Sequence, residues 1–549
     1  VQPLKEYVAG ETGPVLWVTM AAVSLVLIIA CGNVTNLLLA RGDAQAPSHS
    51  VRLALGASRH RVMRMLVAES AILAGAGGAL GAVLAAALTG VLSSLAPDTF
   101  PRLNEIGVDG PVLVCALLMT GGTVVLAGLW PAIRASGAGA TGGLGRGGRG
   151  TVSPGTGRLG KGLVSLQVAL ALTVAVGSGL MLRSLDRLLS EEVGMDGQNV
   201  LTFKPSPPEA RYETRLDFER YYGQVLERVA AVPGVTDVGA IHLLPGTGGN
   251  WSFPVFTGAP VADDETVPSA NFRAVRPGYF ETVRVPLLRG RTLVDGDSRD
   301  AEPVVVVNQA FVDRFWPGED PLSQRLSVFS ASGTAHRVVG VVGDVRQHRR
   351  SLAPLPEMYF TPGQAPMDRL SMWIMARFDR GPVLERAAAV RQVVWEIDPE
   401  VPIVEMDDME AVLRRSTHMT RFLALLLTGF GALAVGLGAV GVFGVAAFTA
   451  GRRKPEFGLR MAVGATRQSV LRSALRQTLS PVAVGLVGGL AAAAATSRFL
   501  SAALYDVAPT DPVTFLGVAA LLAATAVLAS LLPAWRASRV DPASVLTAE

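Results

Sequence analysis

Seven stretches of about twenty mainly apolar residues constrain this chain more than any other feature. They cover approximately residues 15–40, 70–95, 111–133, 162–182, 420–448, 479–500 and 513–533. An α-helix needs about 20 such residues to cross the roughly 30 Å hydrocarbon core of a bilayer. Half of the chain is apolar and 17% is charged, a balance that does not fit an ordinary soluble globule. The stretches therefore predict an integral membrane α-helical bundle with about seven spans.

The long polar segment between the fourth and fifth stretches, residues 188–417, has a different character. It contains the strand-like runs Val304–Val307 and Val338–Val342 and the helical pattern Phe218–Val229. We expect one water-exposed α+β domain here, with room for two subdomains.

Basic residues gather in alternate loops. They are Arg41, Arg52, Arg59, Arg61 and Arg64 after the first span, Arg134, Arg146, Arg149, Arg158 and Lys161 after the third, Arg452, Arg453, Lys454, Arg460, Arg467, Arg472 and Arg476 after the fifth, and Arg536 and Arg539 after the seventh. The other short loops are acidic or nearly neutral. Because Arg and Lys in short loops stay in the cytoplasm, the pattern predicts an N-terminus outside, a cytoplasmic C-terminus and an exterior or periplasmic domain at 188–417.

Two loop sequences occur twice. Arg-Leu-Ala-Leu-Gly-Ala-Ser-Arg at residues 52–59 recurs as Arg-Met-Ala-Val-Gly-Ala-Thr-Arg at residues 460–467, which places Arg460 408 positions after Arg52. Trp-Pro-Ala-Ile-Arg-Ala-Ser at residues 130–136 recurs as Leu-Pro-Ala-Trp-Arg-Ala-Ser at residues 532–538, at an offset of 402. Self-similarity at this scale indicates a tandem repeat of one membrane module.

The repeat gives the chain six expected parts. They are the tail of a missing first exterior domain at 1–14, a three-span module at 15–136, a cytoplasmic linker at 137–160, the fourth span at 161–187, the exterior domain at 188–417 and a second three-span module at 418–549. The linker is assigned because its many glycines lose too much backbone freedom on ordering. A first span and most of a first exterior domain would then be absent from this sequence.

These motifs resemble those of the MacB, FtsX and lipoprotein-release class of ABC permeases. The paired loops, the Pro-Ala-Xaa-Arg-Ala-Ser ends, the terminal segment Val540–Leu546 and the exterior strings Val339–Val345 and Pro356–Phe360 carry the likeness. The doubled layout resembles the duplicated orphan permeases (ADOP type), N-terminally incomplete. The resemblance implies two FtsX-like modules, a MacB-like periplasmic domain and a multi-pass protein of the bacterial inner membrane.

The repeated loops have two interpretations. Ser58 and Thr466 are placed to cap short helices that run through Ala68 and Leu475. Each helix would be basic and amphipathic, so it either lies among lipid headgroups or docks on a separate ATPase dimer. The resemblance favours docking and gives the candidate coupling residues Arg52, Gly56, Arg59, Arg61, Arg64, Glu456, Arg460, Gly464, Arg467 and Arg472. The first loop has Ala46–Val51 where the second has Glu456 and its neighbours, so we expect its docking to be weaker or altered.

Polar and small residues also occur inside the apolar stretches. Asn33 and Asn36 lie one turn apart near the cytoplasmic end of the first span, and we expect a boundary or interhelical hydrogen-bond role. Glycines between Gly429 and Gly444 provide a small face on which helices can pack closely.

No motif for catalysis is apparent. A phosphate-binding loop requires Gly-x-x-x-x-Gly-Lys-Ser/Thr, and Gly160-Lys161-Gly162 ends in glycine. The six histidines show no metal-ligand spacing, and His336 and His348 are expected as solvated loop residues. We therefore expect no catalytic, cofactor or metal site in this chain, with ATP and Mg²⁺ on a partner ATPase. Lipid is a further partner, a periplasmic adaptor is an additional candidate, and nucleic acid is not expected because the net charge is only +4.

The expected function is that of a transporter permease, not an enzyme. By resemblance it would couple ATP hydrolysis on the partner to movement of the exterior domain, for export or extraction of a substrate. Two alternatives remain: an FtsX-like regulator of cell-wall hydrolases, and a membrane-anchored exterior receptor or enzyme.

Overall fold

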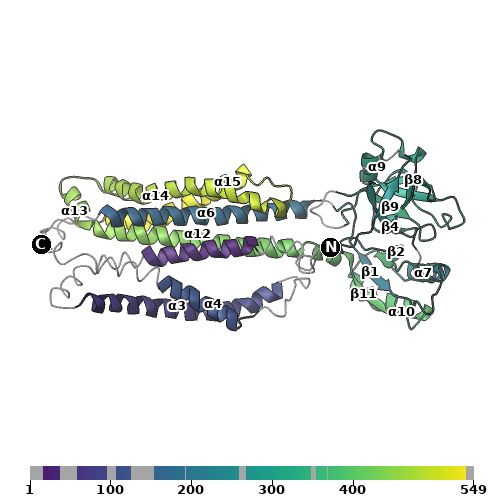
Figure 1. Ribbon diagram of the computed structural model, residues 1–549, viewed down its shortest axis with the longest axis horizontal. Helices are drawn as coiled ribbons and strands as arrows, with labels where there is room; N and C mark the ends of the chain where they lie inside the picture. The colour runs from purple at the N-terminus through teal and green to yellow at the C-terminus, as the bar shows by residue number, and fades with distance from the viewer. Residues whose placement is uncertain are drawn as a thin grey trace. The chain divides into compact units, whose positions relative to one another are not determined.

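The computed structural model describes residues 17–36, 58–95, 107–124, 154–191, 193–258, 267–347, 354–367 and 369–539. The chain forms two compact units, one of residues 1–187 and 419–549 and one of residues 188–418. The first unit is helical (Figure 1). The second contains two β-sheets with helices.

The helices of the first unit are mostly long and apolar. They are the Trp17–Asn36 helix, α3 (Arg59–Leu95), α4 (Gly110–Val124), α6 (Pro154–Ser190), α12 (His418–Arg452), α13 (Lys454–Ala462), α14 (Arg467–Thr496), the 3-10 helix η5 (Ser497–Ala503) and α15 (Pro512–Ala537). Six of the described helices are long and apolar enough to span a membrane. The third expected span, 111–133, is described only to Val124, and its apolar helix Gly110–Gly122 is shorter.

Helix α6 packs closely against α12, α14 and α15 (Figure 1). The contacts use glycines that leave no space for a side chain. A Cβ atom on Gly431 of α12 would lie 2.6 Å from Ser178 Oγ, and one on Gly485 of α14 would lie 2.5 Å from the Ser165 carbonyl oxygen. Such approach of backbones is how membrane helices gain packing contacts without a hydrophobic driving force. The predicted small face is confirmed at Gly431, Gly438 and Gly441, whereas a Cβ atom at Gly429 or Gly436 would meet no other part of the structure within 4 Å.

Three helix boundaries differ from the sequence-based expectation. The expected short helices ending at Ala68 and Leu475 are wrong, because α3 and α14 continue without a break for 37 and 30 residues. Once a turn has formed, extension adds one hydrogen bond per residue, so an amphipathic start joins the apolar span that follows. Helix α6 begins at Pro154, within the expected linker, because proline is well suited to a first helical turn.

One sheet of the second unit has a split βαββαβ arrangement. Strands β1 (Val200–Pro205), β2 (Val235–Ile241), β10 (Trp373–Phe378) and β11 (Ile403–Asp408) pair antiparallel in the order β11-β1-β10-β2. Helices α7 (Arg215–Ala230) and α10 (Ala387–Ile397) pack on one face through a shared apolar core. This is the ferredoxin-like order of strands and helices. The helix expected at Phe218–Val229 is confirmed as part of α7.

The other sheet is inserted between β2 and β10. Its strands are β3 (Ser252–Phe256), β4 (Ser269–Ala274), β5 (Leu287–Gly290), β6 (Val304–Asn308), β7 (Arg325–Val328), β8 (His336–Val342) and β9 (Glu357–Phe360). Their order is β5-β8-β6-β9-β4-β3-β7, and β7 also pairs with β8, which closes a ring of strands. The short elements α8 (Tyr279–Thr282), α9 (Gln309–Phe315), η3 (Pro321–Ser323), η4 (Val383–Arg386) and α11 (Met409–Arg415) complete the unit.

Two predictions about this sheet have different outcomes. The strands expected at Val304–Val307 and Val338–Val342 are confirmed as β6 and β8. The expectation that His336 is a solvated loop residue is wrong, because it begins β8 and is buried. Burial lowers the pKa of His336 below its ordinary value. His348 lies outside the described residues.

The two sheets share a core that contains a buried ion pair. Tyr279 and Tyr359 pack there with Met375 of the ferredoxin-like sheet. Arg273 on β4 and Glu357 on β9 lie 3.1 Å apart, and each is 1% exposed. Tyr359 donates a 2.5 Å hydrogen bond to Glu357. Burial raises the pKa of the Glu357 carboxyl above its ordinary value, although Arg273 and the hydrogen bonds oppose that rise.

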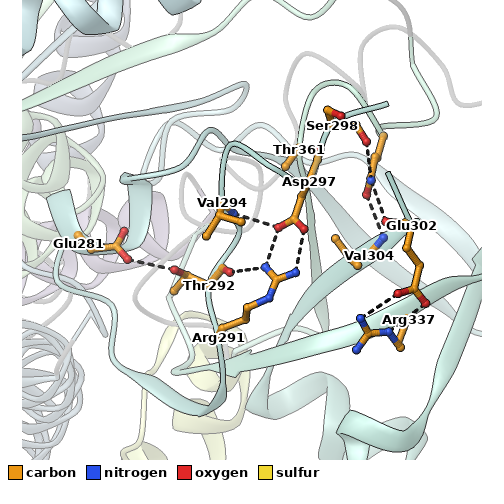
Figure 2. A network of polar contacts seen from close by, with 11 residues as sticks. Glu281, Arg291, Thr292, Val294, Asp297, Ser298, Glu302, Val304, Arg337 and Thr361 are labelled. Atoms are coloured by element: carbon orange, nitrogen blue, oxygen red, sulfur yellow. Dashed lines mark hydrogen bonds and ion pairs between the residues drawn. The ribbon is translucent and has the colours of Figure 1, made fainter. Parts of the chain in front are cut away.

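A polar network holds the segment between β5 and β6 against the inserted sheet (Figure 2). Arg291 forms a bidentate pair with Asp297, whose carboxylate also accepts a 3.0 Å bond from the Val294 N–H. Thr361 donates to the Asp297 carbonyl oxygen. Glu302 pairs with Arg337 at the start of β8. Burial alone would raise the pKa of Asp297, but the bonds from Arg291 and Val294 lower it below its ordinary value.

Replacing Asp297 with Asn is expected to destabilise this unit by about 1–3 kcal/mol, because the change removes charge-assisted hydrogen bonds. The folded pKa of Asp297 is lowered, so its contribution is complete above the unfolded carboxyl pKa of about 3.9 and disappears as pH falls through the folded value. Denaturant unfolding of the purified full-length protein at several pH values measures this. A difference between Asp297→Asn and the parent that does not shrink at acidic pH would contradict the argument.

Candidate functional site

The candidate site is the segment that joins α12 to α14, residues 453–467, which we name the elbow. It contains Glu456, Arg460, Gly464 and Arg467 from the predicted set, and Arg472 follows on α14. The elbow folds as the short helix α13 and a tight turn. The structure therefore brings the predicted residues of the second loop together on one compact element.

Helix α13 begins immediately after α12 because the sequence supplies a proline and an acidic residue. Pro455 occupies the first turn, where its missing N–H costs nothing. Glu456 lies in the same turn, where a negative charge is favourable to the helix dipole. Its carboxylate bonds Arg460 one turn later at 2.5 Å and lies 3.8 Å from Arg453. Glu456 therefore orders two of the basic side chains of the elbow.

The turn after α13 requires glycine. Gly464 has φ of +99°, a conformation that side chains disfavour. Its N–H bonds the Met461 carbonyl at 3.0 Å, and the Ala465 N–H bonds the Arg460 carbonyl at 2.9 Å, which is the Schellman pattern of a helix end. Thr466 then caps α14 by accepting a 3.3 Å bond from the Ser469 N–H, as predicted.

A phenylalanine anchors the elbow to the helical bundle. Phe457 is 1% exposed and packs among small residues of three long helices, Ala450 of α12, Ala474 of α14 and Ala534 of α15. Met461, one turn further along α13, packs against the same cluster. Movement of α13 would therefore bear on these helices, because packed side chains transmit a shift.

The opposite side of the elbow exposes apolar side chains among arginines. Leu459 is 58% exposed and Val463 is 82% exposed. Exposed arginines lie on the same segment, at Arg460 and Arg467, and near the start of α14, at Arg472. Arginine beside exposed aliphatic side chains is a composition that protein interfaces favour. The surface is suited to binding a protein with an apolar recess and acidic residues.

The first loop is described only in part. Ser58 accepts a 3.4 Å bond from the Arg61 N–H at the start of α3, which confirms the predicted cap. Arg61 and Arg64 are exposed, and Arg59 is the first residue of α3. Arg52 and Gly56 lie outside the described residues.

Three residues of the elbow were missed by the sequence reasoning. The anchor is Phe457, and the exposed apolar surface is formed by Leu459 and Val463. The predicted coupling residues in the elbow were only charged residues and a glycine. The spacing of Phe457 and Met461, four residues apart, indicates one buried helical face and could have identified the anchor. Among the described residues, no group of three or more His, Cys, Asp or Glu side chains is arranged to hold a metal ion.

Two family models match this sequence. The FtsX-like permease C-terminal model matches residues 20–140 and 428–542, which include the elbow, and the MacB-like periplasmic core domain model matches residues 162–393. The chain belongs to the MacB/FtsX-like family of ABC transporter permeases. The permease is thus a multi-pass membrane protein with a MacB-like periplasmic domain.

Two curated relatives of the permease are named as export proteins. It is 25% identical over 405 residues to the pyoverdine export ATP-binding/permease protein PvdT of Pseudomonas putida, covering 71% of this chain and 56% of PvdT. It is 22% identical over 305 residues to the macrolide export ATP-binding/permease protein MacB of Mannheimia succiniciproducens, covering 53% and 46%. The permease spans about half the length of these two relatives.

A solved structure gives a weaker match. The crystal structure of the periplasmic region of MacB from Actinobacillus actinomycetemcomitans aligns with a TM-score of 0.29 and 14% identity. The alignment covers 42% of this chain and 96% of that one.

Proposed function

We propose that the permease couples ATP hydrolysis by a separate ATPase dimer to movement of its periplasmic domain, for export or extraction of a substrate. The observation that carries this proposal is the elbow. It joins an exposed surface of Leu459, Val463 and arginines to a buried anchor at Phe457. A partner that binds the exposed side would therefore act directly on α12, α14 and α15.

The long helices provide a route for that movement. Helix α12 runs unbroken from His418 to Arg452. At 1.5 Å per residue it is about 50 Å long, enough to cross a bilayer. The helix begins where the periplasmic domain ends in sequence, and its last residue precedes the elbow. In this mechanism of force transmission the helices carry motion and need not form a conduit.

We also propose that the permease contains two FtsX-like modules, with seven crossings, a cytoplasmic C-terminus and a location in the inner membrane. The match of one family model to two segments supports this. Two aspartates that lie 402 positions apart, the offset of the second repeated loop, also support it, because both cap the start of an apolar helix. Asp109 accepts a 3.0 Å bond from the Val112 N–H, and Asp511 accepts a 2.9 Å bond from the Thr514 N–H. Two modules would supply two elbows, one for each subunit of an ATPase dimer.

Reversing the charge of Arg467 and Arg472 tests the coupling role. Arg467→Glu with Arg472→Glu is expected to abolish co-purification of the ATPase with the tagged permease and the stimulation of its ATP hydrolysis in nanodiscs. The matched control is Arg421→Glu with Arg498→Glu, which makes the same charge change on exposed residues of α12 and η5 away from the elbow. Unchanged stimulation in the elbow variant, or an equal loss in the control, would refute the role.

A further inference from the structure

The buried face of the Trp17–Asn36 helix follows a regular spacing. Its inward positions Ala22, Val26, Ile29 and Asn33 are separated by four, three and four residues. Ala22, Ile29 and Asn33 are buried, whereas neighbouring Ile28 and Val34 are 48% and 39% exposed. This is the seam spacing of helices that pack in parallel with interlocking side chains.

The partner of this seam is its repeat equivalent on α12. Phe430, Ala434, Leu437 and Gly441 follow Ala22, Val26, Ile29 and Asn33 by 408 positions each, the same offset as the loop repeat. Ala22 packs in one apolar cluster with Phe430, and Val26 and Ile29 share another with Ala434 and Leu437. The apolar counterparts therefore lie in common clusters, and the fourth pair, Asn33 and Gly441, is in direct contact. Contact between equivalent positions is the mark of a two-fold interface.

Asn33 makes a polar contact across the seam, one turn before its counterpart Gly441. Asn33 donates a 2.7 Å hydrogen bond to the Leu437 carbonyl oxygen. A Cβ atom on Gly441 would lie 2.3 Å from Asn33 Oδ1 and 2.7 Å from Gln167 Oε1 of α6. The absence of a side chain at Gly441 therefore creates the space that the Asn33 amide occupies. Asn33 is 6% exposed and Gln167 is 3% exposed, so both amides lie inside the bundle.

We propose that the Trp17–Asn36 helix and α12 form an in-register pair about a local two-fold axis, so that one chain is built like a dimer. The Asn33–Gly441 contact sets its register and its choice of partner. A buried asparagine at a single seam position is known to fix the register and number of helices that pair. This inference rests on the proposed repeat but not on the coupling role of the elbow.

The contact also works against pairing of like helices from two chains. Two copies of the Trp17–Asn36 helix would place two asparagine side chains at one crossing point, and two copies of α12 would leave two glycines there. Only a Trp17–Asn36 helix paired with α12 brings the Asn33 amide to a position where Gly441 leaves room for it. Specificity of this kind rests on the fit of the correct pair, since two facing asparagines could still hydrogen-bond each other.

Cysteine cross-linking in native membranes tests the geometry. In a chain with Cys31→Ala and Cys115→Ala, Asn33→Cys and Gly441→Cys are expected to form a disulfide on oxidation. A Cβ atom on Gly441 would lie 3.5 Å from Asn33 Cγ, whose place the sulfur of a cysteine at position 33 would take, so a disulfide is within reach. A protease site inserted in the stretch 137–153 allows detection, because only the disulfide then holds the two fragments together on a non-reducing gel.

Two controls define the outcome. Val34→Cys with Val440→Cys, one residue away on each helix and both exposed, is expected to leave the fragments separate. Co-expressed chains that carry Asn33→Cys alone and Gly441→Cys alone, with different tags, are expected to give no mixed adduct. Separate fragments in the seam pair, or an abundant mixed adduct between chains, would overturn the proposal. The readout needs no ATPase, so its failure differs from failure of the coupling role.

A residue swap tests the two-fold relation itself. Asn33→Gly and Gly441→Asn are each expected to lower the melting temperature of the detergent-purified protein. Their combination should recover most of the loss, because the amide at 441 would reach the carbonyl of Ile29, the equivalent of Leu437. Losses that simply add in the double variant would show that the two positions do not act as a symmetric pair.

Discussion

Arg273→Met is expected to unfold much of the periplasmic domain at physiological temperature. Glu357 lies 3.1 Å away with 1% exposure, so the substitution leaves a carboxylate buried without its cation. Removal of one partner from such a pair costs about 3–5 kcal/mol, a large part of the 5–15 kcal/mol that stabilises a typical domain. Tryptophan fluorescence of the detergent-purified protein measures the loss, because four of the seven tryptophans lie in residues 188–418.

A second substitution separates charge from packing. Arg273→Met with Glu357→Gln removes both charges and keeps an acceptor for Tyr359, which donates to Glu357 at 2.5 Å. We expect this pair to recover most of the stability. Arg380→Met, at a site 88% exposed, should have almost no effect. A double variant as unstable as Arg273→Met would show that shape, not charge, decides the loss.

The instability of Arg273→Met should also depend on pH. Burial raises the folded pKa of Glu357, and the variant lacks the arginine that opposes this rise. A carboxyl whose pKa is higher in the folded than in the unfolded state stabilises the fold at pH values below its unfolded pKa, which is about 4.3 for glutamate. That stabilisation is lost as pH rises through the folded pKa. The deficit of the variant relative to the parent should therefore be largest near neutral pH and smaller in acid. An equal deficit at all pH values would exclude the carboxylate as its cause.

Gly489→Leu is the second substitution from which we expect a large effect. A Cβ atom at this position of α14 would lie 2.9 Å from Ala169 Cα, Ala169 O and Leu172 Cβ of α6. Because two of these atoms are backbone, the clash is relieved only if the helices separate. Overpacking typically costs about 1–3 kcal/mol, and the full length of a leucine side chain should reach or exceed that range. Thermal unfolding and gel filtration in detergent measure the loss of the folded bundle.

The neighbouring glycine provides the control. Gly488 is exposed, and a Cβ atom there would contact nothing within 4 Å. Gly488→Leu carries the same change in helix propensity and hydrophobicity one residue away, so it should fold like the parent. Equal damage from both substitutions would indicate that glycine is needed for the backbone of α14 and not for its approach to α6.

Much of the elbow could be predicted from local sequence. Thr466 caps α14 and Glu456 pairs with Arg460 because these contacts involve residues three or four positions apart. The anchor was missed because its partners Ala450, Ala474 and Ala534 are distant in sequence. The continuity of α14 was also missed, since the change from basic to apolar residues was interpreted as a helix boundary.

The amino-acid sequence by itself determined the membrane class, the extent of the apolar segments and the presence of repeated loops. Length and hydropathy suffice for these, because the bilayer imposes the same requirement on every span. Only the tertiary structure decided which residues lie together: Asn33 with Gly441, Arg273 with Glu357, and Phe457 with three helices. Such contacts depend on how helices and sheets pack, and a close-packed interior distinguishes arrangements that hydrophobicity alone leaves equivalent.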